Sequence, residues 1–543
     1  MMIDLLLFPL FLCFIYGIGA GVLVIGQGKP DVYPLWFYFA AGLLAVGFTS
    51  LMVNFFSGAA SPAFYVMVIL LCVLGLRNIR RADFPEFIPL GIMLTPLASG
   101  MLPGSDAGLY HLPHQLWIRE EKIVFGLANF HSRYGFSSFM EYIGAPLWVG
   151  DHFKLVSYAA AVFPLMLLLF LLQAARSAQV QTAAVGLLIT ASLIIYSHYF
   201  EFSYTSTDTP TGIMFALAFF YGLQLLWDDA PPGRTKLAVF FLCAAFCFML
   251  KVSGALMFLW VMFVVATQLR ARRMAWRDLM PSAIIPAVLV MVWLVRGVII
   301  SGCLLYPVAQ SCIDVPWVAT DKAIENSIGI TNHARHPATD DMTAWFTVWW
   351  LPHYAVFILA VLAHSVAVAA LYRYYFREKL PERPGIVVPA LVFALMALAV
   401  WFIKAPTPRF GIGVFIILPI TVALSLFGLR RIDEKTLRSW RDKIPDRMGA
   451  IGQFIERNGM KQAPGTILVM LLAVKFGVFG APLRHIIKPF DMLAVPAAVD
   501  TRPDKHFGIR SGPDCECFLE KYCGPDDRPV MGEYDGYKYF EKP

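Results

Sequence analysis

The sequence predicts an all-α protein that crosses a membrane many times, and three observations carry this prediction. Of its 543 residues, 58% are hydrophobic and only 15% are charged, whereas soluble proteins carry roughly 25% charged residues. The mean hydropathy is +0.64. Apolar runs of about 20 residues recur along the whole chain, and a run of that length spans about 30 Å of hydrocarbon. The first run, 3–26, lacks a basic region and a cleavage site, so we expect a retained helix rather than a signal peptide.

The apolar runs predict about fourteen membrane spans. They lie at 3–26, 34–54, 63–76, 84–101, 153–173, 181–199, 211–227, 237–250, 253–268, 279–300, 354–372, 385–403, 410–428 and 465–481. The two runs that flank Lys251 could instead form one re-entrant hairpin. The run 84–101 contains Pro85, Pro89 and Pro96, so it could be kinked.

The distribution of Lys and Arg predicts the orientation, because cytoplasmic loops of membrane proteins carry an excess of both. Five segments on one side are basic: those with Arg77, Arg80 and Arg81; Arg234 and Lys236; Arg270, Arg272, Arg273 and Arg277; Arg373, Arg377, Lys379 and Arg383; and the run from Arg430. We expect these in the cytoplasm. The loops 102–152 and 301–353 and the tail 484–543 are then outside. The net charge of +7 reflects this bias and gives no reason to expect nucleic acid.

The same boundaries predict the organisation of the chain. It comprises N-terminal spans (1–101), a first outer loop with interfacial helices (102–152), a transmembrane core (153–429) that includes the outer loop 301–353, a basic amphipathic cytoplasmic segment (430–464), a last span (465–483) and an outer tail that contains cysteines (484–543). The cytoplasmic segment is expected to lie on anionic lipid.

The cysteines fit this placement. Four fall inside apolar spans, where a thiol packs as a small hydrophobe: Cys13, Cys72, Cys243 and Cys247. Five fall on the outer side, where disulfides persist: Cys303, Cys312, Cys515, Cys517 and Cys523. Cys303 with Cys312 is the simplest local pair, and Cys515 or Cys517 with Cys523 is a second candidate. A zinc site in the tail is disfavoured because no histidine lies near these cysteines.

The first outer loop is unusually rich in polar residues for so apolar a chain. Asp106 follows Pro103-Gly104-Ser105, and Ser105 or Asp106 could simply cap an interfacial helix. Many further polar side chains follow in the same loop: His111, His114, Glu120, Glu121, Asn129, His131, Arg133 and Glu141. Histidines and carboxylates at a membrane surface suit proton transfer and the binding of hydroxyl-rich or phosphorylated ligands.

Other polar residues are predicted on the same outer face. Asp208 precedes the span 211–227, and a helix N-cap role with Pro210 in the first turn is favoured over a catalytic role. Four cations could be lipid anchors or phosphate ligands: Lys251, Arg296, Lys404 and Arg409. Arginine inside a span usually has a partner, which is expected for Arg296. Lys404 and Arg409 bracket the stretch APTP and could clamp a phosphate or diphosphate.

Four stretches resemble motifs of one enzyme superfamily. They are DAGLYHLP from Asp106, GLANFHSRYGF from Gly126, WLVRGVIISGCLLYP from Trp293 and APTPRFG from Ala405. This pattern resembles the GT-C superfamily of polytopic glycosyltransferases, and most closely a bacterial group similar to aminoarabinose or mannosyl transferases. The likeness covers roughly 104–430. Many GT-C enzymes have two adjacent acidic residues in the first loop, whereas Ser105 precedes Asp106 here, which favours a reaction without metal.

The resemblance implies a GT-C-like fold and an inverting transfer of sugar from a polyprenyl-phosphate-linked donor to a glycan, lipid or protein at the periplasmic face of the bacterial inner membrane. Asp106 would be the general base. The four cations would bind the donor phosphate, with Arg409 ranked first, Lys251 second and Arg296 third. Eight further residues would bind substrate: His111, His114, Glu120, Glu121, Asn129, His131, Arg133 and Asp208. No cofactor is predicted, and a divalent metal is left open.

Three other functions are compatible with a membrane protein of this kind. A polysaccharide polymerase or ligase of another fold would also use a lipid-diphosphate donor. A transporter or flippase of lipid-linked sugars would need ionisable residues along a two-sided pathway, usually with repeat symmetry, and the sequence shows no internal repeat. A subunit without catalytic activity is the third alternative.

Overall fold

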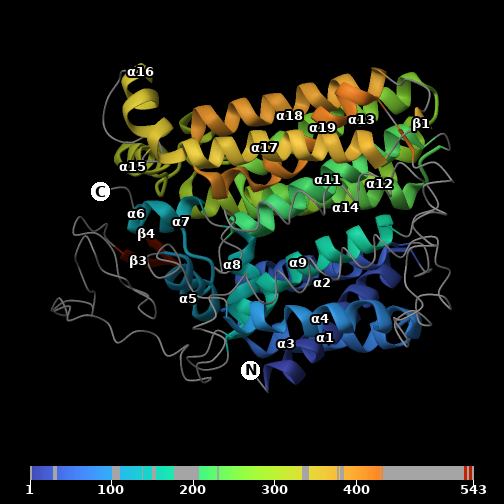
Figure 1. Cartoon of the computed structure of the whole chain (residues 1–543). Coiled ribbons are helices and arrows are strands. Elements are labelled where there is room, and N and C mark those ends of the chain that lie inside the picture. The colour runs from blue at the N-terminus through green and yellow to red at the C-terminus, as the bar shows by residue number, and fades with distance from the viewer. Residues whose placement is uncertain are drawn as a thin grey trace.

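The structure of the protein is a computed structural model, and its described part is almost entirely helical (Figure 1). It describes residues 3–27, 33–100, 110–136, 138–148, 154–175, 207–228, 231–332, 342–375, 378–379, 384–428, 430–431, 531–534 and 537–540.

The first four long helices pack together around α1 (Asp4–Gln27), which contacts α2 (Leu35–Asn54), α3 (Pro62–Leu76) and α4 (Phe84–Gly100). The crossing of α1 and α3 is very close. A Cβ atom built on Gly75 would lie 1.9 Å from the carbonyl oxygen of Gly17. Small residues at such crossings let two backbones approach inside a membrane, where burial of apolar surface does not drive helices together.

The remaining long helices form the core around α11 (Asp208–Trp227), which is buried along nearly its whole length. It packs on α9, α12, α13 and α19. The long helices of the core are α9 (Lys154–Ala175), α11, α12 (Arg234–Leu250), α13 (Leu256–Arg270), α14 (Trp276–Ser301), α17 (Leu351–Tyr375), α18 (Pro384–Lys404) and α19 (Ile412–Phe427).

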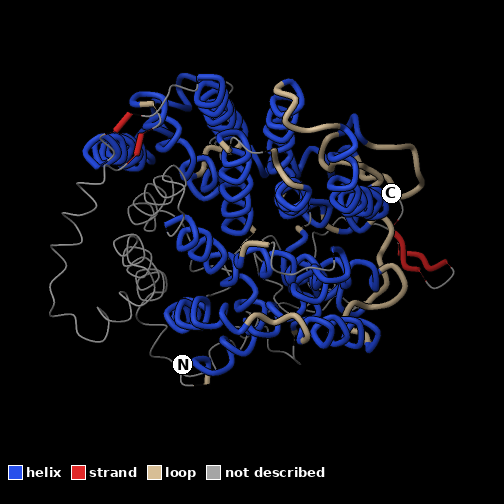
Figure 2. The backbone as a smooth tube through the Cα atoms, turned by 90° about the vertical axis from the view of Figure 1, so that its right-hand side faces the viewer, coloured by secondary structure: helices blue, strands red, loops and turns tan. Residues whose placement is uncertain are grey.

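Short elements gather at one end of the bundle (Figure 1). They are α5 (Leu112–Glu120), α6 (Leu127–Phe130), α7 (Ser132–Phe136), α8 (Phe139–Gly144), α15 (Asp321–Asn332), α16 (Met342–Ala344) and the antiparallel strands β3 (Met531–Tyr534) and β4 (Tyr537–Phe540). Strands β1 (Glu378–Lys379) and β2 (Arg430–Arg431) pair on the opposite side (Figure 2). Single helical turns complete the described chain: η2 (Arg81–Asp83), η4 (Ala145–Leu147), η5 (Val252–Ala255), η6 (Ala309–Ser311), the π turn η8 (Trp345–Trp350) and η9 (Pro408–Gly411).

The described residues include 8 helices long and apolar enough to cross a membrane, or up to 9 if the bent pair α3 and α4 forms one span. Apart from 181–199 and 465–481, which lie outside the described residues, every predicted span falls on a helix. The bend of 97° lies between α3 and α4. Residues 252–270 pass the same test alone, whereas α12, with 17 residues, is not among the eight helices.

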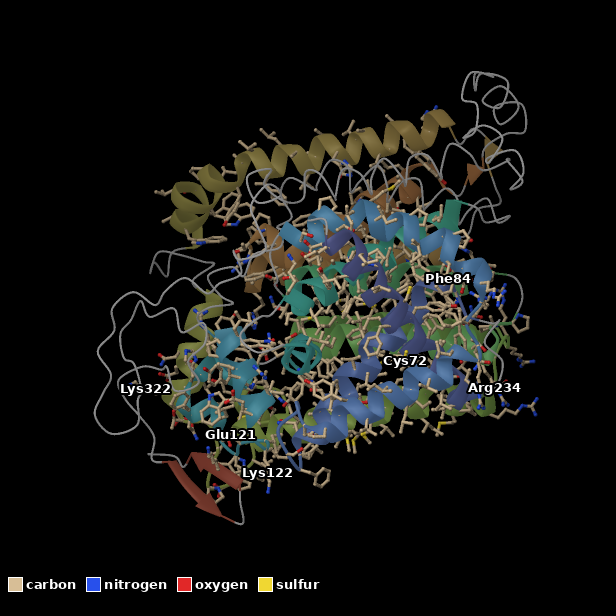
Figure 3. The ribbon with its side chains drawn as sticks, turned by 90° about the horizontal axis from the view of Figure 1, so that it is seen from below. Cys72, Phe84, Glu121, Lys122, Arg234 and Lys322 are labelled. Carbon is tan, nitrogen blue, oxygen red and sulfur yellow. A yellow bond between two sulfur atoms is a disulfide. The ribbon has the colours of Figure 1, made fainter. Side chains whose placement is uncertain are left out.

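Charged residues lie at both ends of the bundle. Arg234 lies at one end, whereas Glu121, Lys122 and Lys322 lie at the other (Figure 3). At the Arg234 end, Asp228 forms an ion pair with Lys236 at 2.8 Å, and its carbonyl accepts a hydrogen bond from Arg273. We call the opposite end, which carries α5 to α8, the outer end.

We predict that Gly75→Ala destabilises the protein, because the added methyl group would overlap the backbone of α1. Overpacking of this kind costs about 1–3 kcal/mol. Gly385→Ala is the matched control, because no atom lies within 4 Å of a Cβ added there. Thermal unfolding of the two purified variants measures the difference, and equal melting temperatures would contradict the close crossing.

Candidate functional site at the outer end

The first cluster of polar residues, which we call the Asp208 cluster, consists of Asp208, Lys251, Arg409 and Phe410. The Nζ atom of Lys251 lies 2.5 Å from Oδ1 of Asp208. The Nε atom of Arg409 lies 3.7 Å from the other carboxylate oxygen. The Asp208 side chain is 7% exposed, whereas those of Lys251 and Arg409 are 31% and 30% exposed. A buried carboxylate therefore holds two cations that remain accessible.

Three separate elements bring these side chains together. Asp208 is the first residue of α11. Lys251 follows the last residue of α12 in an extended conformation, with φ −159° and ψ 138°, and the chain then turns into η5. Arg409 lies in η9, whose first residue is Pro408. The ring of Phe410 packs against both cations, with its centroid 3.9 Å from the Lys251 ammonium and 5.0 Å from the Arg409 guanidinium.

The sequence interpretation of Asp208 as a helix cap is wrong. Thr207 occupies the N-cap position, and it makes no side-chain capping bond. Asp208 is instead the first residue of the helix, where a negative charge is favourable beside the helix dipole, and its carboxylate contacts two cations. Among the described residues, the cluster brings one carboxylate and two cations together. This arrangement suits the binding of a phosphate group.

The second cluster, which we call the Glu141 cluster, consists of Glu141, His111, His114, Tyr142 and Arg296. Each carboxylate oxygen of Glu141 binds one imidazole: Oε1 lies 2.6 Å from Nδ1 of His111, and Oε2 lies 2.8 Å from Nδ1 of His114. The two histidines are three residues apart at the start of α5, so one helix face presents both. Glu141 is 1% exposed.

Ser138 fixes the position of Glu141 through a capping box at the start of α8. The backbone amide of Ser138 donates to Oε2 of Glu141 at 3.0 Å, and the Ser138 hydroxyl accepts from the amide of Met140. The same hydroxyl donates to the carbonyl oxygen of Leu250 at 2.6 Å. Since Leu250 precedes Lys251, this bond links the backbones that carry the two clusters.

Arg296 has aromatic partners instead of a carboxylate. Its Nε donates to the hydroxyl of Tyr142 at 3.1 Å, and its guanidinium lies 4.9 Å from the ring centroid of Trp293 and 5.4 Å from that of Tyr142. The residue is 2% exposed, and one terminal nitrogen has no hydrogen-bond partner among the described residues. The sequence predicted a partner for Arg296, and Tyr142 is that partner. The sequence also suggested that Arg296 binds phosphate, but its side chain is too buried for a bound phosphate to reach.

The environment of the Glu141 cluster shifts its proton affinities. Burial alone would raise the pKa of Glu141, but the attraction and hydrogen bonds of the two imidazoles outweigh burial and hold that pKa well below its usual value. Burial lowers the pKa of His114 despite the attraction of Glu141, and the charge of Arg296 lowers it further. Burial also lowers the pKa of His131 to about 4, with help from the charge of Arg133. Glu141 is therefore ionised while His114 and His131 are neutral.

Several other predicted substrate ligands hold the outer loops together. The Asn129 amide donates to the carbonyl oxygens of Trp317 and Val318 and accepts from the amide of Thr320. It thus joins the first outer loop to the loop 301–353. Glu121 forms an ion pair of 2.9 Å with Lys538 of β4.

The remaining predicted ligands are more dispersed. The Arg133 guanidinium lies 4.8 Å from the ring centroid of Tyr110, and the His131 ring stacks on Tyr134. Glu120 and Lys404 are exposed. Lys404 is the last residue of α18, and the cation that shares a carboxylate with Arg409 is Lys251.

Asp106 lies outside the described residues, as do Cys515, Cys517 and Cys523. Within the described ranges, no group of three or more His, Cys, Asp or Glu side chains could hold a metal ion.

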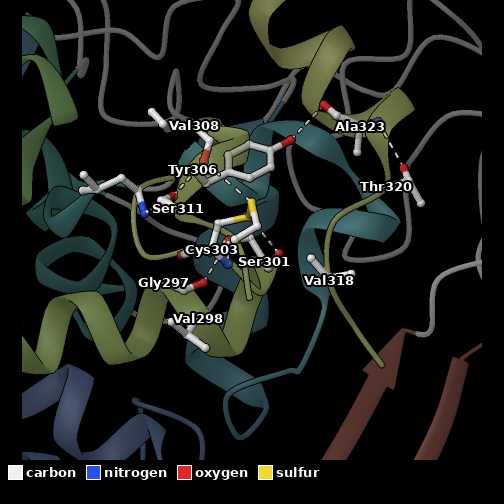
Figure 4. Close-up of a disulfide and its surroundings, with 12 residues drawn as sticks. Gly297, Val298, Ser301, Cys303, Tyr306, Val308, Ser311, Val318, Thr320 and Ala323 are labelled. Carbon is white, nitrogen blue, oxygen red and sulfur yellow. Dashed lines mark hydrogen bonds between the residues drawn. A yellow bond between two sulfur atoms is a disulfide. The ribbon is translucent and has the colours of Figure 1, made fainter. Parts of the chain in front are cut away.

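The predicted disulfide between Cys303 and Cys312 is confirmed (Figure 4). It closes the chain directly after α14, and the neighbouring Tyr306 hydroxyl donates to the carbonyl oxygen of Ala323 at 2.9 Å. Cys13, Cys72, Cys243 and Cys247 are free thiols, as their predicted place in apolar spans requires.

A protein family described as "Domain of unknown function (DUF8201)" matches residues 1–416. The chain belongs to this family. The DUF8201 match contains both polar clusters and the disulfide, and it ends within α19, before the β3–β4 hairpin. Neither the curated proteins nor the solved structures contain a match to the chain.

We predict that this DUF8201 protein has fewer free thiols than cysteines. The sequence holds 9 cysteines, and one disulfide removes two of them, so denatured, unreduced protein should show at most seven reactive thiols. Reduction should then expose all of them. A count of nine before reduction would exclude the bond. Cys303→Ser with Cys312→Ser should destabilise the protein, typically by about 2–4 kcal/mol.

Proposed function

We propose that the protein is a GT-C-type glycosyltransferase that moves a sugar from a polyprenyl-phosphate-linked donor to an acceptor. The observation that supports this best is the Asp208 cluster, because it presents an ammonium and a guanidinium side by side at the outer end. We also propose that this end faces the periplasm of a bacterial inner membrane, that the chain has about fourteen spans, and that the segments 102–152 and 484–543 are both outside.

In the proposed reaction, Lys251 and Arg409 bind the phosphate of the donor. Transfer breaks the bond between the anomeric carbon and the phosphate oxygen, and the bonding electrons leave with the lipid phosphate. Cations that are already in place stabilise the negative charge that develops there. Asp208 keeps both cations near one point before the donor arrives, so little reorganisation is needed during the reaction.

Asp106 is the proposed general base. Its carboxylate takes the proton from the acceptor hydroxyl or amine while the freed electron pair forms the new bond to the anomeric carbon. An aspartate with an ordinary pKa near ~3.9 is ionised at neutral pH, so it can take a proton without special tuning. Asp106 is five residues before His111, so the Glu141 cluster holds the end of its loop.

We expect Asp106→Asn to abolish transfer while donor binding persists. Asparagine keeps the size and the capping ability of aspartate, so only the proton-accepting function is lost. General bases contribute about 10²–10⁴-fold, and the rate should fall by at least that order. The rate is measured as the release of polyprenyl phosphate from polyprenyl-phosphate sugars by the full chain in lipid nanodiscs.

The control for Asp106→Asn is Asp314→Asn, which makes the same chemical change at an exposed position of the loop 301–353 and should keep its activity. If Asp106→Asn retains more than about a tenth of the wild-type rate, the loss of rate is smaller than a general base usually causes. Asp106 is then not the base. A wild-type chain that is inactive with polyprenyl-phosphate sugars but releases lipid diphosphate from polyprenyl-diphosphate-linked glycans would support a polymerase or ligase.

The cations should affect binding of the lipid product directly. We predict that Lys251→Ala and Arg409→Ala each weaken binding of polyprenyl phosphate about 10- to 100-fold, because hydrogen bonds to charged groups contribute about 1.5–3 kcal/mol. Lys322→Ala, which removes an exposed cation on the same end, should change binding little. Binding that is unchanged in both cluster variants would place the phosphate elsewhere.

A further inference from the structure

The Glu141 carboxylate determines which nitrogen of each histidine carries the proton. An ionised carboxylate can only accept hydrogen bonds, and both of its oxygens contact an Nδ1 atom. Each Nδ1 must therefore be the protonated donor. In a neutral imidazole the other nitrogen, Nε2, then carries a lone pair and can only accept.

The charges of the cluster agree with neutral imidazoles. Glu141 contributes one negative charge and Arg296 one positive charge, so the buried group is balanced when both histidines are neutral. Protonation of His114 would add an uncompensated charge next to Arg296, and its lowered pKa reflects that proximity together with burial. With its proton on Nδ1, each imidazole that is neutral presents Nε2 as an acceptor.

The two acceptors differ in accessibility. The side chain of His114 is 1% exposed, and its Nε2 has no hydrogen-bond partner among the described residues. The side chain of His111 is 13% exposed and lies at the N-cap of α5. Its ring packs at a tilt against Tyr110, with ring centroids 4.1 Å apart. His111 is therefore the histidine that a bound molecule can reach.

We propose that Glu141 is a positioning residue that presents Nε2 of His111 as the acceptor of a hydrogen bond from a hydroxyl group of a bound sugar. A neutral hydroxyl group is the donor that fits best, because an anionic phosphate would find a lone pair rather than a proton at this atom. The Asp208 cluster would hold the phosphate and the Glu141 cluster a sugar hydroxyl, with Ser138 linking the two. This assignment rests on the proposed glycosyltransferase function and adds a division of roles to it.

Glu141→Gln separates the positioning role from the structural one. Glutamine also completes a capping box at this position, so α8 should keep its start. The amide, however, offers one acceptor and one donor group. It cannot accept from two Nδ1–H groups as the carboxylate does, and its NH₂ group would favour the opposite tautomer in one histidine.

The first experiment does not depend on any enzymatic activity. Nitrogen-15 spectra of the full chain in lipid bilayers, with ¹⁵N-labelled histidine, distinguish protonated from unprotonated ring nitrogens. The resonances are assigned by their loss in His111→Gln and His114→Gln. We expect Nε2 of both residues to be unprotonated in the wild type and one of the two to change in Glu141→Gln. A protonated Nε2 on His111 in the wild type would overturn the proposal.

The second experiment uses release of polyprenyl phosphate from a panel of polyprenyl-phosphate sugars. Glu141→Gln and His111→Phe should each lower kcat/KM about 10- to 100-fold, mainly through a higher KM, while the melting temperature of Glu141→Gln stays near that of the wild type. Glu325→Gln, the same change at an exposed site of α15, should behave as wild type. Wild-type kinetics in Glu141→Gln would refute the positioning role. A wild type without transfer would refute the proposed function, and the spectra would still decide the tautomer.

Discussion

The outer end of the helical core is organised around one buried carboxylate. Asp208 contacts Lys251 and Arg409. Lys251 approaches from the junction of α12 and η5 and Arg409 from η9, and the two cations would repel each other without the carboxylate. Removing one partner from a buried ion pair typically costs about 3–5 kcal/mol, although the partial exposure of the cations makes this an upper bound here. The start of α11 therefore fixes where α12 ends and where the turn before α19 lies.

A second buried carboxylate, Glu141, organises two imidazoles instead of an ammonium and a guanidinium. It binds two imidazoles and completes the start of α8. The Ser138 hydroxyl then joins this arrangement to the backbone of Leu250. The two carboxylates thus divide the outer end into a part with two cations and a part with two imidazoles, and the bond between Ser138 and Leu250 links the two parts.

The apolar runs of the sequence were sufficient to predict where the long helices lie. Each helix that crosses a membrane must have a similar length and an apolar surface. The sequence was also sufficient to single out Asp208, Lys251 and Arg409 as polar residues of interest. The meeting of these three could not be predicted, since it depends on how helices pack and not on local spacing. Local reasoning made Asp208 a helix cap, because a carboxylate before Pro210 fits that role and its partner lies 43 residues away.

Glu141 was noted among the polar residues of the first outer loop but was not chosen as a site residue. Two signals could have identified it: Ser138 and Glu141 have the spacing of a capping box, and His111 and His114 have the spacing of one helix face. Asn129 was assigned to substrate because an amide in a loop can bind many groups. Only the fold shows that its partners are backbone atoms of the loop 301–353.

The contact between the β3–β4 hairpin and the first outer loop has a consequence for the order of assembly. Lys538 and Glu121 are 417 residues apart, and the amide of Phe125 donates to the carbonyl oxygen of Lys538. At a synthesis rate of about 5–20 residues per second, the loop emerges roughly 20–80 s before its last partner exists. The helices of the described core are therefore all synthesised before the hairpin that contacts the first loop.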